Sequence, residues 1–170
     1  MSENDEVAEL DRFRDIVLSA IEKVFPTQWR RDDLKRRILS GNPQDVDGKC
    51  SYGGSVEVAQ ELTQQLSTKV YKVTSGNKGT SGHVYLFIKN TGLIVDPSAG
   101  QFIPPSSRTG YEKFFKGNMF IGPRDILKKA ALEGVVNTRT PKDAELSFNR
   151  IWGEQSLNLM PGEDVQSLIT

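Results

Sequence analysis

The chain contains few of the residues that commonly form disulfides and metal sites. Its 170 residues include one cysteine and one histidine. A single cysteine cannot form an internal disulfide, so folding has to depend on the hydrophobic core. One cysteine and one histidine also fall short of the three or four ligands of a usual zinc site, and no Cys-x-x-Cys or His-x-x-x-His spacing occurs. We therefore expect neither a metal nor another cofactor.

The chain also has no excess of charge and no long apolar run. Lys and Arg together number 22, as do Asp and Glu, so nothing favours nucleic acid or an anionic membrane as a partner. No apolar stretch approaches the ~20 residues of a membrane span. Residues 1–6 are acidic and polar, unlike a signal peptide. These features predict a cytoplasmic protein, or one secreted into a host or target cell without a cleavable signal peptide.

The order of apolar patterns predicts an α+β fold in a single domain. We expect residues 1–6 to be a disordered acidic tail and residues 153–170 to be loosely packed. Helical periodicity and strand-like apolar runs place the elements between them. The expected helices are 6–25, 27–39, 50–67, 123–132 and 143–152, with Gly134 ending the fourth, and a helical turn is expected at 111–115. The expected strands are 70–73, 83–88 and 93–96.

Five Arg and Lys residues lie between positions 30 and 37, on the polar side of the second expected helix. Such a run is usually a solvated helix face. The alternative, a nucleic-acid interface, would give steep salt-dependent binding, and the zero net charge argues against it.

Three residues form a candidate catalytic set. Cys50 lies where the glycine-containing loop 41–49 is expected to give way to a helix, and the positive end of the helix dipole favours a thiolate there. His83 begins one expected strand and Asp96 ends the next. A thiol, an imidazole and a carboxylate are the minimum set for nucleophilic thiol catalysis.

Side-chain parity in the expected hairpin supports this set. Asn90 and Gly92, between two apolar runs, indicate a tight turn. With a two- or four-residue loop, Tyr85 pairs with Asp96, and His83 then shares a sheet face with Asp96. The carboxylate could accept a hydrogen bond from one imidazole nitrogen and leave the other for Cys50, which is the logic of the serine triad applied to a thiol.

Each of these residues also has an ordinary explanation. A lone cysteine is often a small core residue, a lone histidine is often structural, and Asp-Pro is a common way to leave a sheet. Their order along the chain favours the catalytic interpretation. A thiol site also needs oxyanion donors, for which the Cys50 N–H and the side-chain amide of Gln44 or Asn42 are candidates.

Together, the cysteine at a helix start, the strand GHVYLFI and the segment GLIVDPSAGQF resemble the papain-like and transglutaminase-like superfamily of Cys-His-Asp thiol enzymes. The compact spacing is most similar to bacterial effector and toxin domains that deamidate glutamine. The resemblance covers residues 44–102 and implies a papain-like fold, with the nucleophile helix on a small antiparallel sheet and a catalytic domain spanning 7–170. It implies Cys50 as nucleophile, His83 as general base and acid, Asp96 as its orienting partner and Gln44 as an oxyanion donor.

The resemblance implies a thiol hydrolase that acts on a protein substrate through a thioester. A protein-glutamine deamidase is favoured because the chain is small. A cysteine peptidase is the nearest alternative, although the Cys-Gly-Ser-Cys-Trp motif of papain is absent. A transglutaminase or acyltransferase, and a papain-like binding module without turnover, also stay open.

Overall fold

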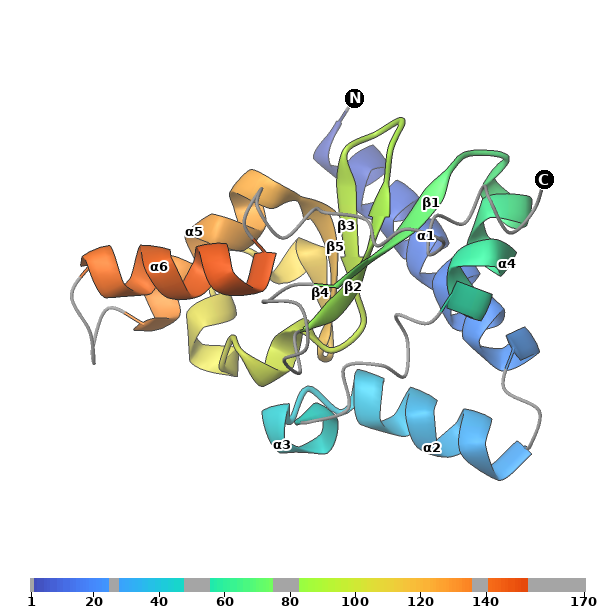
Figure 1. Cartoon of the computed structure of the whole chain (residues 1–170), viewed down its shortest axis with the longest axis horizontal. Coiled ribbons are helices and arrows are strands. Elements are labelled where there is room, and N and C mark those ends of the chain that lie inside the picture. The colour runs from blue at the N-terminus through green and yellow to red at the C-terminus, as the bar shows by residue number, and fades with distance from the viewer. Residues whose placement is uncertain (1, 25–27, 48–55, 75–82, 136–140, 153–170) are drawn as a thin grey trace.

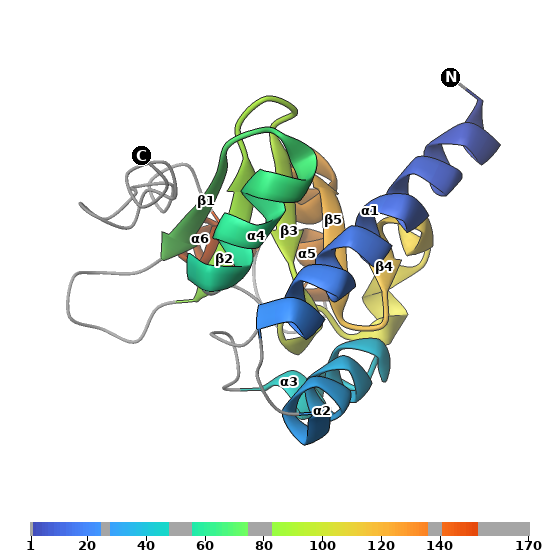
Figure 2. The ribbon, with the colours of Figure 1, turned by 90° about the vertical axis from the view of Figure 1, so that its right-hand side faces the viewer.

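An antiparallel sheet lies between two layers of helices in the computed structural model, which describes residues 2–24, 28–47, 56–74, 83–135 and 141–152. The sheet has five strands in the order β1-β2-β3-β5-β4. Helices α1 and α4 cover one face, and α5 and α6 lie on the other (Figures 1 and 2). The predicted α+β class is confirmed at this level.

Helix α1 (Glu3–Val24) begins earlier than the sequence pattern indicated. The prediction of a disordered tail over residues 1–6 is therefore wrong from Glu3 onward. The cause is a reciprocal cap: the Asp5 N–H donates to Ser2 Oγ at 3.1 Å, and the Ser2 N–H donates to Asp5 Oδ2 at 3.4 Å. Acidic residues in the first turn also complement the helix dipole. The acidity that suggested a tail thus stabilises a helix start.

Three further helices precede the sheet. Helix α2 (Gln28–Leu39) agrees with the prediction, and α3 (Pro43–Val46) is a single turn inside a segment that we expected to be loop. Helix α4 (Val56–Leu66) packs on both α1 and β1. The predicted start of this helix at Cys50 lies outside the described residues.

The central hairpin has the predicted register. Strands β1 (Val70–Thr74), β2 (Val84–Ile88) and β3 (Leu93–Asp96) are antiparallel neighbours, and Leu86 pairs with Val95. Continuing the register by one residue sets Tyr85 opposite Asp96, as parity required. Gly92 adopts a φ of 70°, which lets the turn close between the two strands.

The C-terminal third contains two strands that the sequence analysis missed. Strand β4 (Phe115–Lys116) has two residues, and β5 (Met119–Pro123) is an apolar run inserted between β3 and β4. The expected helical turn near Tyr111 is the 3-10 helix η3 (Glu112–Phe114). Helix α5 (Arg124–Val135) continues through Gly134, where we expected it to stop, and α6 (Pro141–Trp152) contains the helix predicted over 143–152.

A buried polar cluster joins the start of α3 to the segment after β3. Arg108, in the 3-10 helix η2 (Pro105–Arg108), donates to the carbonyls of Ile103 and Gly117. Asn118 is fully buried and its side chain donates to the carbonyls of Arg37 and Asn42. Its own carbonyl accepts from the N–H of Gly100, in the 3-10 helix η1 (Ala99–Gln101). These bonds fix α3 against η1, which begins three residues after Asp96.

Candidate functional site

His83 and Asp96 form a buried hydrogen-bonded dyad. His83 directly precedes β2, Asp96 is the last residue of β3, and His83 Nε2 lies 2.6 Å from Asp96 Oδ2. The exposed fraction is 6% for His83 and zero for Asp96. The two sequence-predicted residues therefore meet in space as the hairpin parity indicated.

Asp96 receives two further hydrogen bonds. Its Oδ1 accepts the backbone N–H of Ser98 at 3.1 Å, and its Oδ2 accepts Trp152 Nε1–H from α6 at 2.8 Å. The Ser98 hydroxyl lies 3.5 Å from Oδ1 and accepts from the side-chain amide of Gln101. Three donors on one carboxylate offset the cost of burying its charge and fix its orientation.

Aromatic rings surround the imidazole. Tyr85 stacks on His83 with ring centroids 6.0 Å apart, while Phe102 and Trp152 present their edges at 4.9 and 5.9 Å. Phe102 and Trp152 also pack on each other at 5.4 Å. These walls keep water from the bond between His83 and Asp96, which strengthens it relative to the same pair in solvent.

The hydrogen bond to Asp96 assigns different roles to the two ring nitrogens. A carboxylate can only accept, so Nε2 carries the proton that it donates to Asp96, and Nδ1 is the acceptor in the neutral imidazole. Protonation at Nδ1 then gives an imidazolium that the adjacent carboxylate stabilises. This arrangement can perform general acid and base chemistry at Nδ1.

The dyad and α4 lie on opposite faces of the sheet. The hydrogen bond from Trp152 shows that the Asp96 side chain faces α6, and parity sets His83 on that same face. Figures 1 and 2 both show α4 with α1 on the other side. The segment between α3 and α4 contains the chain's single cysteine. Cys50 lies in that segment, outside the described residues.

Gln44, the predicted oxyanion donor, is exposed in the single turn of α3. Its backbone N–H donates to Asn42 Oδ1 at 3.1 Å, so the Asn42 side chain serves as the cap of α3. Helix α3 packs on η1, close in sequence to Asp96. The structure thus places Gln44 near the element that follows the dyad, and it records no contact between the described parts of Gln44 and His83.

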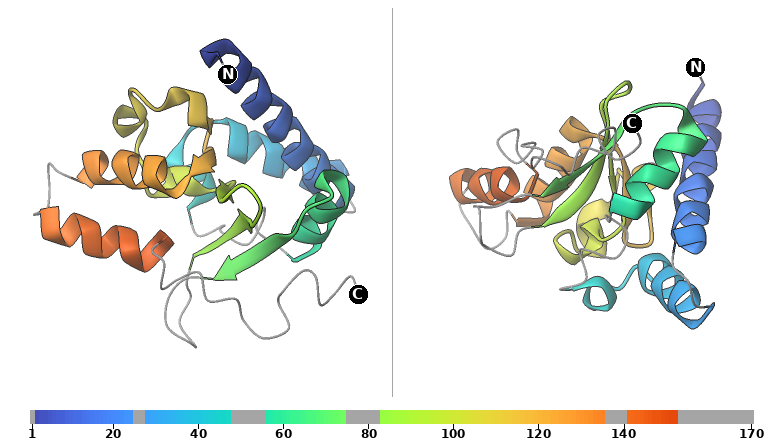
Figure 3. Two further views of the ribbon diagram at one scale, coloured as in Figure 1. Left: turned by 90° about the horizontal axis from the view of Figure 1, so that it is seen from above. Right: turned by 45° about the vertical axis from the view of Figure 1, so that its right-hand side comes forward.

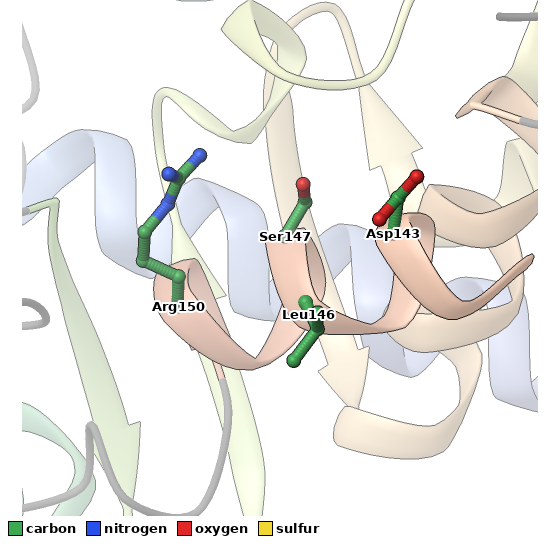
Figure 4. A pocket seen from close by; sticks show the side chains of 4 residues that line it. All are labelled: Asp143, Leu146, Ser147 and Arg150. Carbon is green, nitrogen blue, oxygen red and sulfur yellow. The ribbon is translucent and has the colours of Figure 1, made fainter. Parts of the chain in front are cut away.

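The other described surfaces carry fewer groups that could act in catalysis. A hollow of about 370 Å³ on α6 is lined by Asp143, Leu146, Ser147 and Arg150, which Figure 4 shows along the helix. Their helical spacing places them on a different face of α6 from the buried Ala144, Phe148 and Trp152.

The basic run of α2 is partly neutralised. Arg36 and Arg37 pair with Asp33 at 2.9 and 2.8 Å, and Lys35 pairs with Glu22. These ion pairs are typical of a solvated helix face.

Among the residues that the structure describes, no group of three or more Cys, His, Asp or Glu side chains could hold a metal. No helix within the described ranges is long and apolar enough to cross a bilayer.

Sequence reasoning missed Trp152 and Ser98 as partners of the carboxylate. Ser98 lies two residues after Asp96, and this spacing is the usual one for an Asp side chain that accepts a nearby backbone N–H. Trp152 is 56 residues from Asp96, and only the docking of α6 brings them together. A tryptophan at the end of an amphipathic helix gives no local signal of such a contact.

The comparisons with known proteins give no independent placement. No protein-family model matches the chain, and no significant match was found among curated proteins or solved structures.

Proposed function

We propose that the protein is a cysteine-dependent amide hydrolase with the triad Cys50, His83 and Asp96, acting on glutamine side chains of a protein substrate. The buried His83–Asp96 dyad carries the proposal, because a 2.6 Å bond to a triply hydrogen-bonded carboxylate is the orienting half of a thiol triad. Resemblance to papain-like and transglutaminase-like enzymes supplies the nucleophile and the reaction class. A papain-like fold is part of the same proposal.

Chain geometry supports a meeting of Cys50 with His83. Helix α3 lies beyond the end of the sheet opposite the β2–β3 hairpin, which is the end where His83 and Asp96 lie (Figures 1 and 2). Helix α4 runs back along β1, so the start of α4 also lies toward this end (Figure 3). Both described flanks of the Cys50 segment therefore start from the dyad's end of the sheet.

The distances along the chain are sufficient. Cys50 is three residues after Asp47, a reach of at most about 10 Å, and six residues before Val56, a reach of about 20 Å. The reach of about 20 Å from Val56 exceeds the thickness of one packed layer, about 10 Å, which is the separation between the two faces of the sheet. The thiol can thus approach His83 although α4 covers the other face.

The reaction begins with proton transfer from the Cys50 thiol to His83 Nδ1. The thiolate attacks the amide carbonyl carbon and forms a C–S bond, while the carbonyl electron pair moves to oxygen. Collapse of this intermediate breaks the C–N bond, and the imidazolium gives its proton to the departing ammonia. Water then attacks the thioester with His83 as base, and the thiol and a glutamate side chain are released.

The oxyanion of both tetrahedral intermediates needs donors. The Cys50 N–H and the Gln44 side-chain amide are our candidates, the latter because α3 is fixed on η1 close to Asp96. The acceptor decides the product: water gives deamidation or proteolysis, and an amine gives transamidation. A deamidase is the first candidate because the compact spacing of the three residues resembles that of glutamine-deamidating domains. A peptidase is the second candidate and shares the first half-reaction.

Mass spectrometry of candidate substrate proteins tests the reaction. The proposal predicts conversion of glutamine to glutamate with the wild-type protein and no conversion with Cys50→Ser. Peptide-bond cleavage that depends on Cys50 would instead identify a peptidase, and incorporation of an added amine would identify a transglutaminase. Conversion that is unchanged in Cys50→Ser contradicts the proposal.

A non-catalytic binding module is the competing function. In that case the buried dyad is purely structural, as its full burial and aromatic packing would also allow. Thiol reactivity separates the two, because only a catalytic dyad lowers the pH at which Cys50 reacts. The protein substrate and delivery into a host or target cell belong to the catalytic proposal.

A further inference from the structure

We propose that Trp152 is a positioning residue that orients Asp96 and weakens its hold on the protonated imidazole of His83. Its role in catalysis rests on the proposed function, but its effect on His83 does not require the thiol. The indole comes from the last described turn of α6, so the dyad is complete only with this helix docked on the sheet (Figure 1).

Trp152 orients Asp96 through the geometry of the hydrogen bonds at the carboxylate. Trp152 Nε1–H and His83 Nε2 meet the same oxygen, Asp96 Oδ2, at 2.8 and 2.6 Å. The Ser98 N–H holds the other oxygen at 3.1 Å. One donor on each side of the carboxylate fixes its rotation, and the indole keeps Oδ2 directed at the imidazole. Trp152 is 1% exposed, so no water competes for this bond.

The indole N–H also acts on His83 electrostatically, through the charge of Asp96. Every hydrogen bond donated to a carboxylate partly neutralises its negative charge. The indole N–H therefore reduces the stabilisation that Asp96 gives to an imidazolium. An imidazole that holds its proton less strongly returns it more readily to a leaving group. The indole therefore tunes His83 toward reversible proton transfer while it keeps the dyad aligned.

Few other ionisable groups face the imidazole in the described structure. Asp96 approaches from β3 and Tyr85 stacks from β2, while α6 and the residue after η1 present Trp152 and Phe102. The ionisable Asp143 and Arg150 of α6 line the hollow on a different face of that helix (Figure 4). The effect of the indole can thus be read on His83 with few competing titrations.

The test is the proton NMR titration of His83 in a Cys50→Ser background. His83 is the only histidine, so one imidazole resonance reports it. Trp152→Phe keeps an aromatic ring and removes the N–H. We expect His83 to keep its proton to a higher pH in this variant than in the parent, by more than the uncertainty of the fit.

Two controls isolate the hydrogen bond. The ring centroids of Phe148 and Trp152 lie 5.7 Å apart, so Phe148→Leu perturbs the packing of α6 and keeps the indole N–H. We expect an unchanged His83 titration in this variant. In an Asp96→Asn background, Trp152→Phe should no longer shift His83, because the indole acts through the carboxylate. If Asp96→Asn does not fold, the comparison of Trp152→Phe with Phe148→Leu decides.

Three results would overturn the inference: no shift in Trp152→Phe, an equal shift in Phe148→Leu, or a shift that persists with Asn at position 96. None of these depends on Cys50. Failure of the triad itself would appear separately, as Cys50 alkylation in the wild-type chain that does not respond to His83→Ala.

Discussion

Replacing Asp96 with alanine is expected to lower the free energy of unfolding by about 3–6 kcal/mol. The substitution leaves three buried donors without their acceptor: His83 Nε2–H, Trp152 Nε1–H and the Ser98 N–H. An unsatisfied buried donor costs about 1–3 kcal/mol, and removal of a buried charge recovers part of the sum. A total of this size is a large fraction of the ~5–15 kcal/mol that stabilises a typical domain.

Asp33→Ala is the matched control for urea denaturation. Asp33 also accepts hydrogen bonds from two side chains, Arg36 and Arg37, but it lies on the surface of α2 with a quarter of its side chain exposed. Exposed ion pairs contribute about 0–1 kcal/mol, so this variant should lose less than about 1 kcal/mol. The two variants differ mainly in burial of the carboxylate.

The comparison can refute the described site. If Asp96→Ala unfolds at the same urea concentration as Asp33→Ala, with the same slope, then the carboxylate does not satisfy three buried donors. The arrangement of hydrogen bonds assigned to His83 and Asp96 would then be wrong.

Two further outcomes follow from the contacts. Hydrogen bonds from Arg37 and then Arg36 hold the pKa of Asp33 below its usual range. Its contribution to stability is therefore present above the unfolded value of about 3.9 and is lost as the pH falls through the folded pKa, so the difference in unfolding free energy between wild type and Asp33→Ala should shrink there. Gly100→Ala should cost about 1–3 kcal/mol in thermal unfolding, because a Cβ at this position would overlap the side chain of Asn118. Gly92→Ala, where a Cβ meets nothing within 4 Å and only the φ of 70° opposes it, is the control and should lose less; a larger loss for Gly92→Ala would contradict the packing around η1.

The dyad was accessible from the sequence because strand parity is a local rule. Once Asn90 and Gly92 indicate a tight turn, the face shared by His83 and Asp96 follows without tertiary information. The observed pairing of Leu86 with Val95 confirms that step. The same rule says nothing about which helices cover the face, so it could not predict that α4 lies on the other side.

The missed features depend on contacts between distant segments. Arginine is usually a surface residue, yet Arg108 is only 7% exposed. Its guanidinium donates hydrogen bonds to the carbonyls of Ile103 and Gly117. Burial also lowers the pKa of its guanidinium, although the group stays charged. Strand β5 has no alternation because helices cover both faces of the sheet and its first four residues are all buried, and its apolar run therefore resembled an irregular segment.

Alkylation of Cys50 by iodoacetamide as a function of pH tests the central claim most directly. If His83 and Asp96 form a triad with Cys50, the native wild-type protein should be labelled rapidly near pH 6, and the rate should fall in His83→Ala. Slow labelling with a midpoint near the free-cysteine value of about 8.5, unchanged in His83→Ala, would contradict the account.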